Sequence, residues 1–253
     1  MTPDSFSDGG VNFDPDEAAA AARRMRDEGA AIVDVGGEST RPGSEGVSLD
    51  DELRRVLPVL ERLEGDVRVS IDTSKAEVAR RAVELGAELV NDVTALRADP
   101  ELAGVVADSG AYLCLMHMLG EPRTMQLDPV YEDVVSDIAA FLEERLRVAV
   151  AAGVPEERIC LDPGIGFGKT VEHNFELIRR LDELLALGRP VLIGFSRKSS
   201  LGKLLGDPEA TIGSIAASVG AAVAAYERGA TILRVHDVRE HVEALTAAQA
   251  ALS

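Results

Sequence analysis

Polar side chains follow short apolar runs in this chain, at positions where they could bind a ligand. Asp72, Asn91 and Asp162 each come directly after such a run. A carboxylate accepts two parallel N–H bonds, and an amide presents both a donor and an acceptor. Together these groups suit a polar heterocycle such as a guanine or a pterin. The alternative for any one aspartate is that it only caps the next helix.

Basic side chains follow other apolar runs and predict an anionic ligand group. They are Arg41, the pair Arg197 and Lys198, and the pair Arg234 and His236. Arginine binds phosphate oxygens with two hydrogen bonds at once. On a chain of net charge −18, converging cations therefore indicate a phosphate-like ligand. The alternative is a set of ion pairs with the abundant carboxylates.

Lysine is rare in this chain, so its positions carry information. Only four of the 26 basic Lys and Arg residues are lysines, and all four follow apolar runs: Lys75, Lys169, Lys198 and Lys203. A lysine kept where arginine is favoured suggests a need for a compact, flexible ammonium group.

These positions require strands whose carboxyl ends share one face. The apolar runs predict strands at 31–35, 67–71, 88–90, 111–116, 159–161, 191–195 and 232–235. Because the runs are nearly continuous in apolar residues, they are typical of parallel strands buried on both faces. Helical periodicity predicts helices at 14–28, 48–63, 73–86, 100–109, 130–152, 171–187, 211–228 and 238–252.

Local signals mark several ends of these helices. Gly29 is placed to end the first helix. Ser48 with Asp51 forms a start like a capping box, and Thr73 with Ser74 is expected to cap the next helix.

The alternation of strands and helices predicts the α/β class, as a TIM (β/α)8-type barrel in a single domain over 1–253. In such a barrel all strand ends meet on one face, where the polar residues would converge on one pocket. The pattern supplies seven strands and eight helices, so the first strand, which should precede Thr2, is apparently missing. We expect that the true start lies upstream and that a Val codon was read as Met1, because two strands would otherwise have unpaired edges.

Composition excludes several functional classes. The acidity argues against nucleic acid and anionic membranes as partners, because both are polyanions. It indicates solubility, or alternatively adaptation to salt. The N-terminus lacks the segments of a signal peptide, and the apolar stretch 215–226 is well short of the ~20 residues that span a bilayer. Cys114 and Cys160 lie in apolar runs and are interpreted as reduced core cysteines of a cytoplasmic protein.

Two other patterns are interpreted without a catalytic role. The glycine-rich stretch 164–170 ends like a P-loop, but its required first glycine falls on Pro163. His117, His173 and His241 are expected to serve packing or the surface, since none has a plausible set of metal ligands nearby in sequence.

Seven motifs in order resemble the dihydropteroate synthase family of pterin-binding barrels, over almost the whole chain. They are TPDSFSDGG at 2–10, GGESTRPG at 36–43, IDTSK at 71–75, NDV at 91–93, DPGIGFGK at 162–169, GFSRKS at 194–199 and RVHD at 234–237. Each motif alone is weak, but seven in order are specific.

The resemblance implies condensation of 6-hydroxymethyl-7,8-dihydropterin diphosphate with 4-aminobenzoate, which gives 7,8-dihydropteroate and diphosphate. It implies small-molecule substrates, Mg²⁺ as cofactor, a homodimer formed through the flank of helix 211–228, and sulfonamides as inhibitors. The family carries an Asn-Val pair before the position of Thr2, and this Asn helps bind diphosphate and metal. Here Met1 stands at the Val position and the Asn is absent, so the metal ligands remain unknown.

Residue roles follow from the same resemblance. The predicted catalytic set is Lys198, Asp162, Arg41, Arg234 and His236. The pterin ring would be held by Asp72, Asn91, Asp162 and Lys198 between Met116 and Phe167; the diphosphate by Arg41, Arg234 and His236; the aminobenzoate by Thr40, Pro42, Ser196 and Lys198; and Gly194 and Arg197 complete the substrate-binding set.

The implied chemistry needs no strong general base. Cleavage of a carbon–oxygen bond would leave a cation delocalised into the pterin near Asp162, and the weakly basic arylamine would attack it. Two alternatives stay open: a methyltetrahydrofolate-type methyltransferase of the same superfamily, and a catalytically silent pterin-binding barrel. A methyltransferase of that type would lack the STRPG loop and the SRK and RVH cation cluster.

Overall fold

A computed structural model describes residues 14–39, 44, 46–120 and 124–252 of the chain. The predicted loop that begins at Thr2 and runs to position 10 lies outside the described residues, as do Thr40, Arg41 and Pro42. The chain groups into two compact units. The first comprises Met1–Met116 with Arg145–Ile159, and the second His117–Glu144 with Cys160–Ser253.

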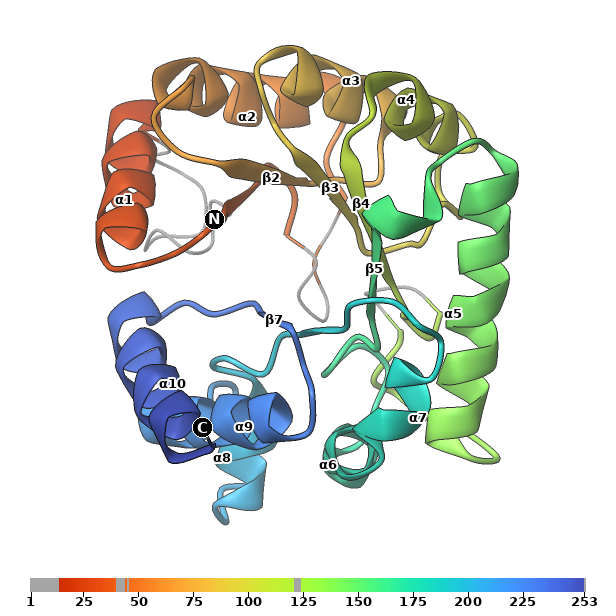
Figure 1. Ribbon diagram of the computed structural model, residues 1–253, viewed down its shortest axis with the longest axis vertical. Helices are drawn as coiled ribbons and strands as arrows, with labels where there is room; N and C mark the ends of the chain where they lie inside the picture. Colours follow the sequence, from red (N-terminus) through yellow and green to blue (C-terminus); the bar gives the residue numbers. More distant parts are fainter. Residues whose placement is uncertain (1–13, 40–43, 45, 121–123, 253) are drawn as a thin grey trace. The chain divides into compact units, whose positions relative to one another are not determined.

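The first unit alternates helices and strands. Strands β1 to β4 pair in chain order, all parallel, and α1 to α4 pack against one another in succession along them (Figure 1). The buried side chains of Val35, Ile71, Val90 and Leu113 lie opposite one another across the sheet. The elements are α1 (Pro15–Asp27), β1 (Val33–Gly36), α2 (Leu49–Leu63), β2 (Val69–Asp72), α3 (Ala76–Glu84), β3 (Leu89–Asp92), α4 (Leu102–Ser109) and β4 (Tyr112–Met116).

The second unit continues the alternation. Strands β6 and β7 pair in parallel, and Leu161 of β5 forms a parallel bridge to Val191 just before β6. The remaining elements of the chain are α5 (Val134–Ala151), the 3-10 turn η2 (Glu156–Arg158), β5 (Ile159–Asp162), α6 (Val171–Arg179), α7 (Leu181–Leu185), β6 (Leu192–Ile193), α8 (Ser199–Leu204), α9 (Ile215–Glu227), β7 (Ile232–Leu233) and α10 (Val238–Leu252).

The seven predicted strands are confirmed in number within the described residues, whereas the helix count is not. Those residues form ten α-helices where eight were predicted. The predicted helix 171–187 is interrupted at Arg180, whose backbone leaves helical geometry with φ −112° and ψ 35°. Helix α8 was missed because six residues that include Gly202 give too short a periodic pattern.

Two of the three local signals are confirmed. Gly29 follows α1 with φ 109°, and Ser48 Oγ accepts the Asp51 N–H at 3.1 Å. The predicted cap of α3 by Thr73 and Ser74 is wrong. The first N–H of α3, from Ala76, is instead accepted by Asp99 Oδ2 at 2.8 Å, from a distant loop that sequence spacing does not reveal.

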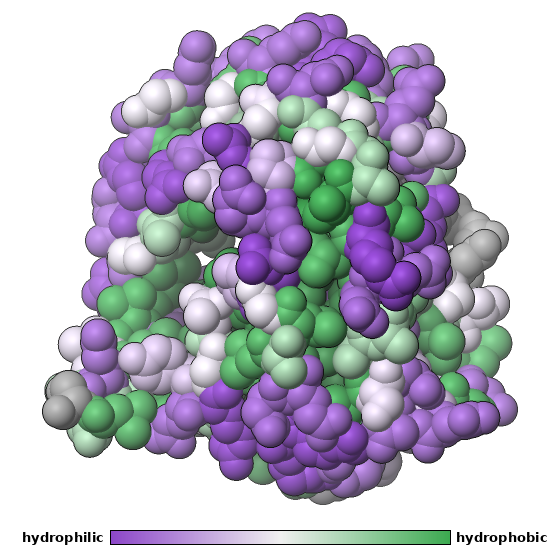
Figure 2. Space-filling model, turned by 45° about the vertical axis from the view of Figure 1, so that its right-hand side comes forward, coloured by the Kyte–Doolittle hydropathy of each residue, from purple (hydrophilic) through white to green (hydrophobic). Residues whose placement is uncertain are grey.

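Figure 2 shows hydrophilic residues over much of one face of the molecule. Both cysteines are buried thiols. None of the helices in the described part of the chain is sufficiently long and apolar to cross a bilayer.

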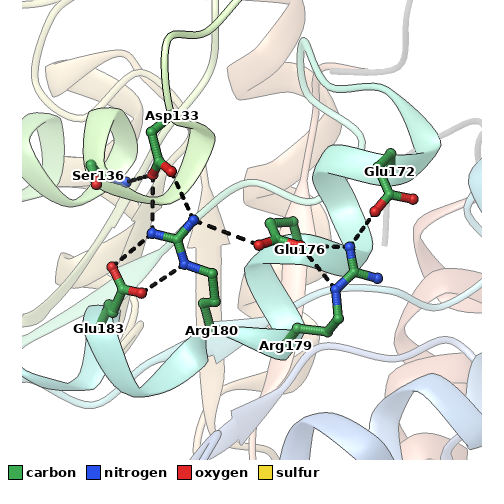
Figure 3. Close-up of polar contacts among 7 residues, drawn as sticks. All are labelled: Asp133, Ser136, Glu172, Glu176, Arg179, Arg180 and Glu183. Atoms are coloured by element: carbon green, nitrogen blue, oxygen red, sulfur yellow. Dashed lines mark hydrogen bonds and ion pairs between the residues drawn. The ribbon is translucent and has the colours of Figure 1, made fainter.

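Arg180 connects the start of α5 to the break between α6 and α7 (Figure 3). Its guanidinium donates to Asp133 Oδ2 at 2.8 Å and Oδ1 at 3.2 Å, and to Glu183 Oε1 at 2.7 Å. Asp133 also accepts the Ser136 N–H at 2.8 Å, so it caps α5. Isolated surface ion pairs contribute little, but bidentate networks are the exception. Arg179, in contrast, pairs with Glu172 and Glu176 on its own helix.

We therefore expect Arg180→Met to lower the thermal unfolding temperature by several degrees, because it unties α5 from the α6–α7 junction. Arg179→Met is the matched control and should change that temperature much less, since its partners lie on α6 itself. Circular dichroism melting curves measure both. Equal losses in the two variants would contradict a special role for Arg180.

Candidate active site

The first unit places two predicted ring-binding residues side by side. Asp72 lies opposite Asn91 in the pairing of β2 with β3, and each is 5% exposed. Asn91 Nδ2 donates to Asp34 Oδ2 at 3.4 Å. Among the described residues, the buried Asn91 Oδ1 has no hydrogen-bond partner. A buried acceptor left without a donor is costly, so this oxygen is ready for a ligand N–H. Met116, at the end of β4, is buried too.

Asp92, next to Asn91, serves the backbone instead. Its Oδ1 accepts the Thr94 N–H at 2.8 Å and the Thr94 hydroxyl at 2.7 Å, and its Oδ2 accepts the Leu96 N–H at 2.5 Å. Ala95 and Leu96 have φ of 52° and 64°, a left-handed conformation that is unfavourable for these side chains. Asp92 thus holds a strained turn, and burial raises the pKa of its carboxyl.

The second unit centres on Asp162 at the end of β5. The residue is 6% exposed, and its Oδ1 accepts the Gly164 N–H at 2.7 Å. Burial raises the pKa of Asp162, while that hydrogen bond and the charges of Lys198, Arg234 and Lys169 oppose the rise. The acid therefore lies in a cationic field, as a carboxylate needs when it is withdrawn from water.

Lys198 lies against the loop that follows β5. The Lys198 ammonium lies over the Phe167 ring, 4.3 Å from its centroid, within the range of a cation–π interaction. Gly166 has φ 81°, and a Cβ there would lie 3.2 Å from Lys198 Cδ. The glycine therefore lets the lysine lie close to the loop. The Gly166 N–H donates to the buried Asn174 Oδ1 at 2.8 Å.

The ends of β6 and β7 are joined by side chains. Ser196 Oγ lies 3.1 Å from the ring Nδ1 of His236. It also accepts the backbone N–H of His236 at 3.2 Å. Burial, with the charges of Arg234 and Arg197, lowers the pKa of His236 to about 4. The imidazole is therefore neutral at pH 7, so it offers hydrogen bonding rather than charge to a ligand.

Arg197, which follows β6, forms hydrogen bonds through both its backbone and its side chain. It has φ 57°, its N–H donates to the buried Ser218 Oγ at 2.9 Å, and its Nε donates to Asp237 Oδ2 at 3.0 Å. Its guanidinium is thus engaged by Asp237. Beside it, a Cβ on Gly194 would lie 3.8 Å from Arg234 Cβ, so the glycine backbone borders that arginine.

Sequence reasoning missed a buried pair, Lys169 with His117. Lys169 is 3% exposed, with its Nζ 3.0 Å from His117 Nδ1 and donating to Phe167 O at 3.0 Å. Burial lowers the pKa of Lys169 to about 7, against the raising effect of Asp162. His117 was expected to pack, and its ring does meet Phe141 edge-on, with centroids 4.8 Å apart. The rarity of lysine was the available signal for Lys169.

The glycine-rich stretch is not free to cradle a phosphate as a P-loop does. The N–H groups of Gly164 and Gly166 are already taken by Asp162 and Asn174. This agrees with the rejection of the P-loop interpretation from the sequence.

The described residues contain no ready-made cluster of metal-binding side chains. Among residues 14–39, 44, 46–120 and 124–252, no group of three or more His, Cys, Asp or Glu side chains could hold a metal ion. Thr2, which marks where the metal-binding Asn of the family would precede the chain, lies outside the described residues. Mg²⁺ stays a prediction from the family resemblance, and the steps proposed for this chain use its own groups.

Comparison with known proteins decides the family. Residues 1–236 match the pterin binding enzyme family. The chain is 45% identical to the dihydropteroate synthase of Escherichia coli K12, over 100% of this chain and 89% of that protein. The chain belongs to the dihydropteroate synthase family.

Solved structures support the same assignment. A Yersinia pestis dihydropteroate synthase, determined with a sulfonamide drug complex, has a TM-score of 0.92 and 45% identity, covering 99% of this chain and 91% of that one. A Xanthomonas albilineans dihydropteroate synthase in complex with 7,8-dihydropteroate has a TM-score of 0.86 and 44% identity, covering 99% and 90%. The predicted α/β class of the TIM-barrel type is thereby confirmed.

The buried ammonium of Lys169 makes a prediction about pH. Because its folded pKa of about 7 lies below the usual ~10.4, the unfolded chain binds this proton more readily between those values. Because of Lys169, the free energy of unfolding should therefore fall by about 1.4 kcal/mol for each unit by which the pH is lowered from 9.5 to 7.5. Lys169→Met removes this slope, as urea unfolding at fixed pH would show.

The control is Lys203→Met, which removes an exposed lysine of α8 and should leave the slope unchanged. If the Lys169→Met and wild-type stability profiles run parallel between pH 7.5 and 9.5, the ammonium is not held in the way described.

Proposed function

We propose that this chain condenses 6-hydroxymethyl-7,8-dihydropterin diphosphate with 4-aminobenzoate, giving 7,8-dihydropteroate and diphosphate. It is a transferase of folate biosynthesis, as full-length identity to dihydropteroate synthases indicates. The observation that carries the residue roles is the buried Asp162 at the end of β5, whose carboxylate accepts the Gly164 N–H and is influenced by the charges of Lys198 and Arg234. That arrangement offers both a carboxylate for a ring and cations for an anion.

Ring recognition is the first proposed role. Asp72, Asn91, Asp162 and Lys198 would hold the pterin, whose edge alternates N–H donors and acceptors that match carboxylate and amide groups. The unpartnered Asn91 Oδ1 supports this role in the first unit. Met116 and Phe167 would supply apolar walls, and Lys198 lies against the Phe167 ring.

Anion binding is the second proposed role. Arg234 and His236, with Arg41 of the segment outside the described residues, would hold the diphosphate. His236 enters as a neutral donor, since burial and Arg234 lower the pKa of its ring. Arg197 belongs to the substrate-binding set by resemblance, and its backbone N–H and its guanidinium are already engaged by Ser218 and Asp237. Gly194 would admit the ligand beside Arg234.

The chemistry follows from these charges. The bond from the pterin methylene carbon to the diphosphate oxygen breaks, and the electron pair leaves with the diphosphate. Arg234 and His236 would stabilise the charge that builds on this leaving group, while Asp162 would stabilise the pterin cation; preorganised charges of this kind lower a barrier without reorganisation. The aminobenzoate nitrogen then forms the new bond and loses its proton.

Further parts of the proposal rest on the resemblance. Thr40, Pro42, Ser196 and Lys198 would line the aminobenzoate side, and a sulfonamide would compete there. The chain 1–253 would act as one domain and pair as a homodimer through α9. The two buried thiols support a reducing, cytoplasmic location.

A coupled assay tests this function. Wild-type protein should release diphosphate from the dihydropterin diphosphate only when 4-aminobenzoate is present, and dihydropteroate should form in equal amount. Arg234→Met should lower kcat/KM for the pterin substrate about tenfold or more, because a charged hydrogen bond contributes about 1.5–3 kcal/mol.

The control is Arg179→Met, whose partners lie on the surface of α6, and it should retain wild-type kinetics. Binding of the pterin without release of diphosphate would favour the silent barrel. Methyl transfer from methyltetrahydrofolate would favour the methyltransferase alternative and contradict the proposal.

A further inference from the structure

Arg197 has an unusual backbone conformation where the chain leaves β6 in the second unit. Its φ of 57° lies in the left-handed region, where the Cβ of a residue other than glycine comes too close to the backbone. Such a residue stays in this region only when its surroundings hold it there. Lys198 follows Arg197 directly, so this one residue sets the direction in which Lys198 leaves the strand.

The hydroxyl of Ser218, in the first turn of α9, holds the N–H group of Arg197. It accepts this N–H at 2.9 Å and donates its own hydrogen to Ser214 O at 2.8 Å. Ser218 is 0% exposed, so water does not compete for either bond. Because Ser214 O fixes the hydroxyl hydrogen, a lone pair of the oxygen is directed at Arg197.

The segment that leads into α9 contacts the same turn. The Gly213 N–H donates to Arg197 O at 3.3 Å. A Cβ on Gly213 would lie 2.7 Å from Lys198 O and 2.6 Å from Leu201 Cβ, so the backbone of Gly213 packs directly on Lys198. Both backbone polar groups of Arg197 are therefore bonded to residues 213–218.

Lys198 carries the effect of this turn toward the loop that follows β5. Its ammonium lies 4.3 Å from the centroid of the Phe167 ring, and a Cβ on Gly166 would lie 3.2 Å from its Cδ. Burial raises the pKa of Asp162, and the charge of Lys198 opposes that rise. A rotation of the Arg197 backbone would therefore shift the ammonium relative to both the ring and the carboxylate.

We propose that Ser218 is a positioning residue, whose hydroxyl holds Arg197 in the left-handed conformation and thereby directs the Lys198 ammonium. This inference rests on the proposed function for its kinetic consequence, since Lys198 is there assigned to the pterin ring. Ser218 acts through the backbone of Arg197 and touches no ligand. The alternative is that the hydroxyl serves α9 alone, as serines do when they bond to the carbonyl four residues earlier.

The variant Ser218→Ala removes one oxygen atom from this arrangement. Ser214 O keeps the Ser218 N–H, at 3.0 Å, whereas the Arg197 N–H loses its acceptor. The protein should remain folded, with a melting temperature lowered by a few degrees, because one buried hydrogen bond is lost. Thr246→Val is the matched control, because the Thr246 hydroxyl of α10 also donates to the carbonyl four residues earlier, Val242 O, at 2.8 Å.

Steady-state kinetics of Ser218→Ala should show a KM for the dihydropterin diphosphate raised about tenfold, because a misplaced binding group loses this much or more. A merely structural role would lower kcat with the active fraction and leave KM unchanged, and that outcome overturns the inference. Thr246→Val should keep both constants.

A glycine at position 197 tests whether the effect runs through the backbone. Glycine adopts positive φ as readily as negative φ, so it needs the Ser218 hydroxyl less than arginine does. Comparing Arg197→Gly with the double variant Arg197→Gly and Ser218→Ala cancels the loss of the guanidinium. In this background, removal of the hydroxyl should raise KM by about threefold at most. A rise equal to that in the arginine background overturns the inference.

Hydrogen exchange gives a readout that does not depend on activity. The Arg197 amide should exchange several-fold faster in Ser218→Ala than in the wild type or in Thr246→Val, because its opening is no longer opposed by the hydroxyl. Unchanged exchange overturns the inference. Wild-type protein without synthase activity would refute the proposed function, and exchange would still decide the role of Ser218.

Discussion

Charge at the carboxyl ends of buried parallel strands is the constraint on which the rest of the structure depends. A carboxylate or ammonium withdrawn from water is tolerated only when opposite charge or hydrogen bonds accompany it. Asp162 meets this requirement through the Gly164 N–H and the positive charges of Lys198 and Arg234. The same cost of burying an unpaired polar group therefore determines which strand-end residues bind a ligand and which need partners within the protein.

This constraint separates supporting residues from ligand-binding ones. Asp92 is fully occupied by the Thr94 and Leu96 amides, so it holds a turn. Its neighbour Asn91 keeps an acceptor without a partner among the described residues. In the second unit, Asp237 engages Arg197. Polar residues at strand ends thus differ in function. Those whose hydrogen-bonding atoms are all engaged within the protein support the fold, and those with an unengaged atom can bind a ligand.

The sequence predicted the strands better than it predicted the helix ends, and the roles of the site residues stay predictions. Buried strands are continuous apolar runs, so their number and order were readable, and polar residues mark where they stop. The cap of α3 by Asp99 and the break at Arg180 depend on partners 23 and 47 residues away in the chain, which local patterns cannot reveal. The Lys169–His117 pair was hidden for the same reason, although the scarcity of lysine pointed to it.

The central claim is that the buried charges around Asp162 recognise a dihydropterin diphosphate. Calorimetric titration of this compound into wild-type protein, Asp162→Asn and Lys198→Ala tests it most directly, with Lys203→Ala as control. Loss of a charged hydrogen bond should weaken binding at least about tenfold in the first two variants, and the control should bind as the wild type does. Unchanged affinity in both Asp162→Asn and Lys198→Ala would contradict the account.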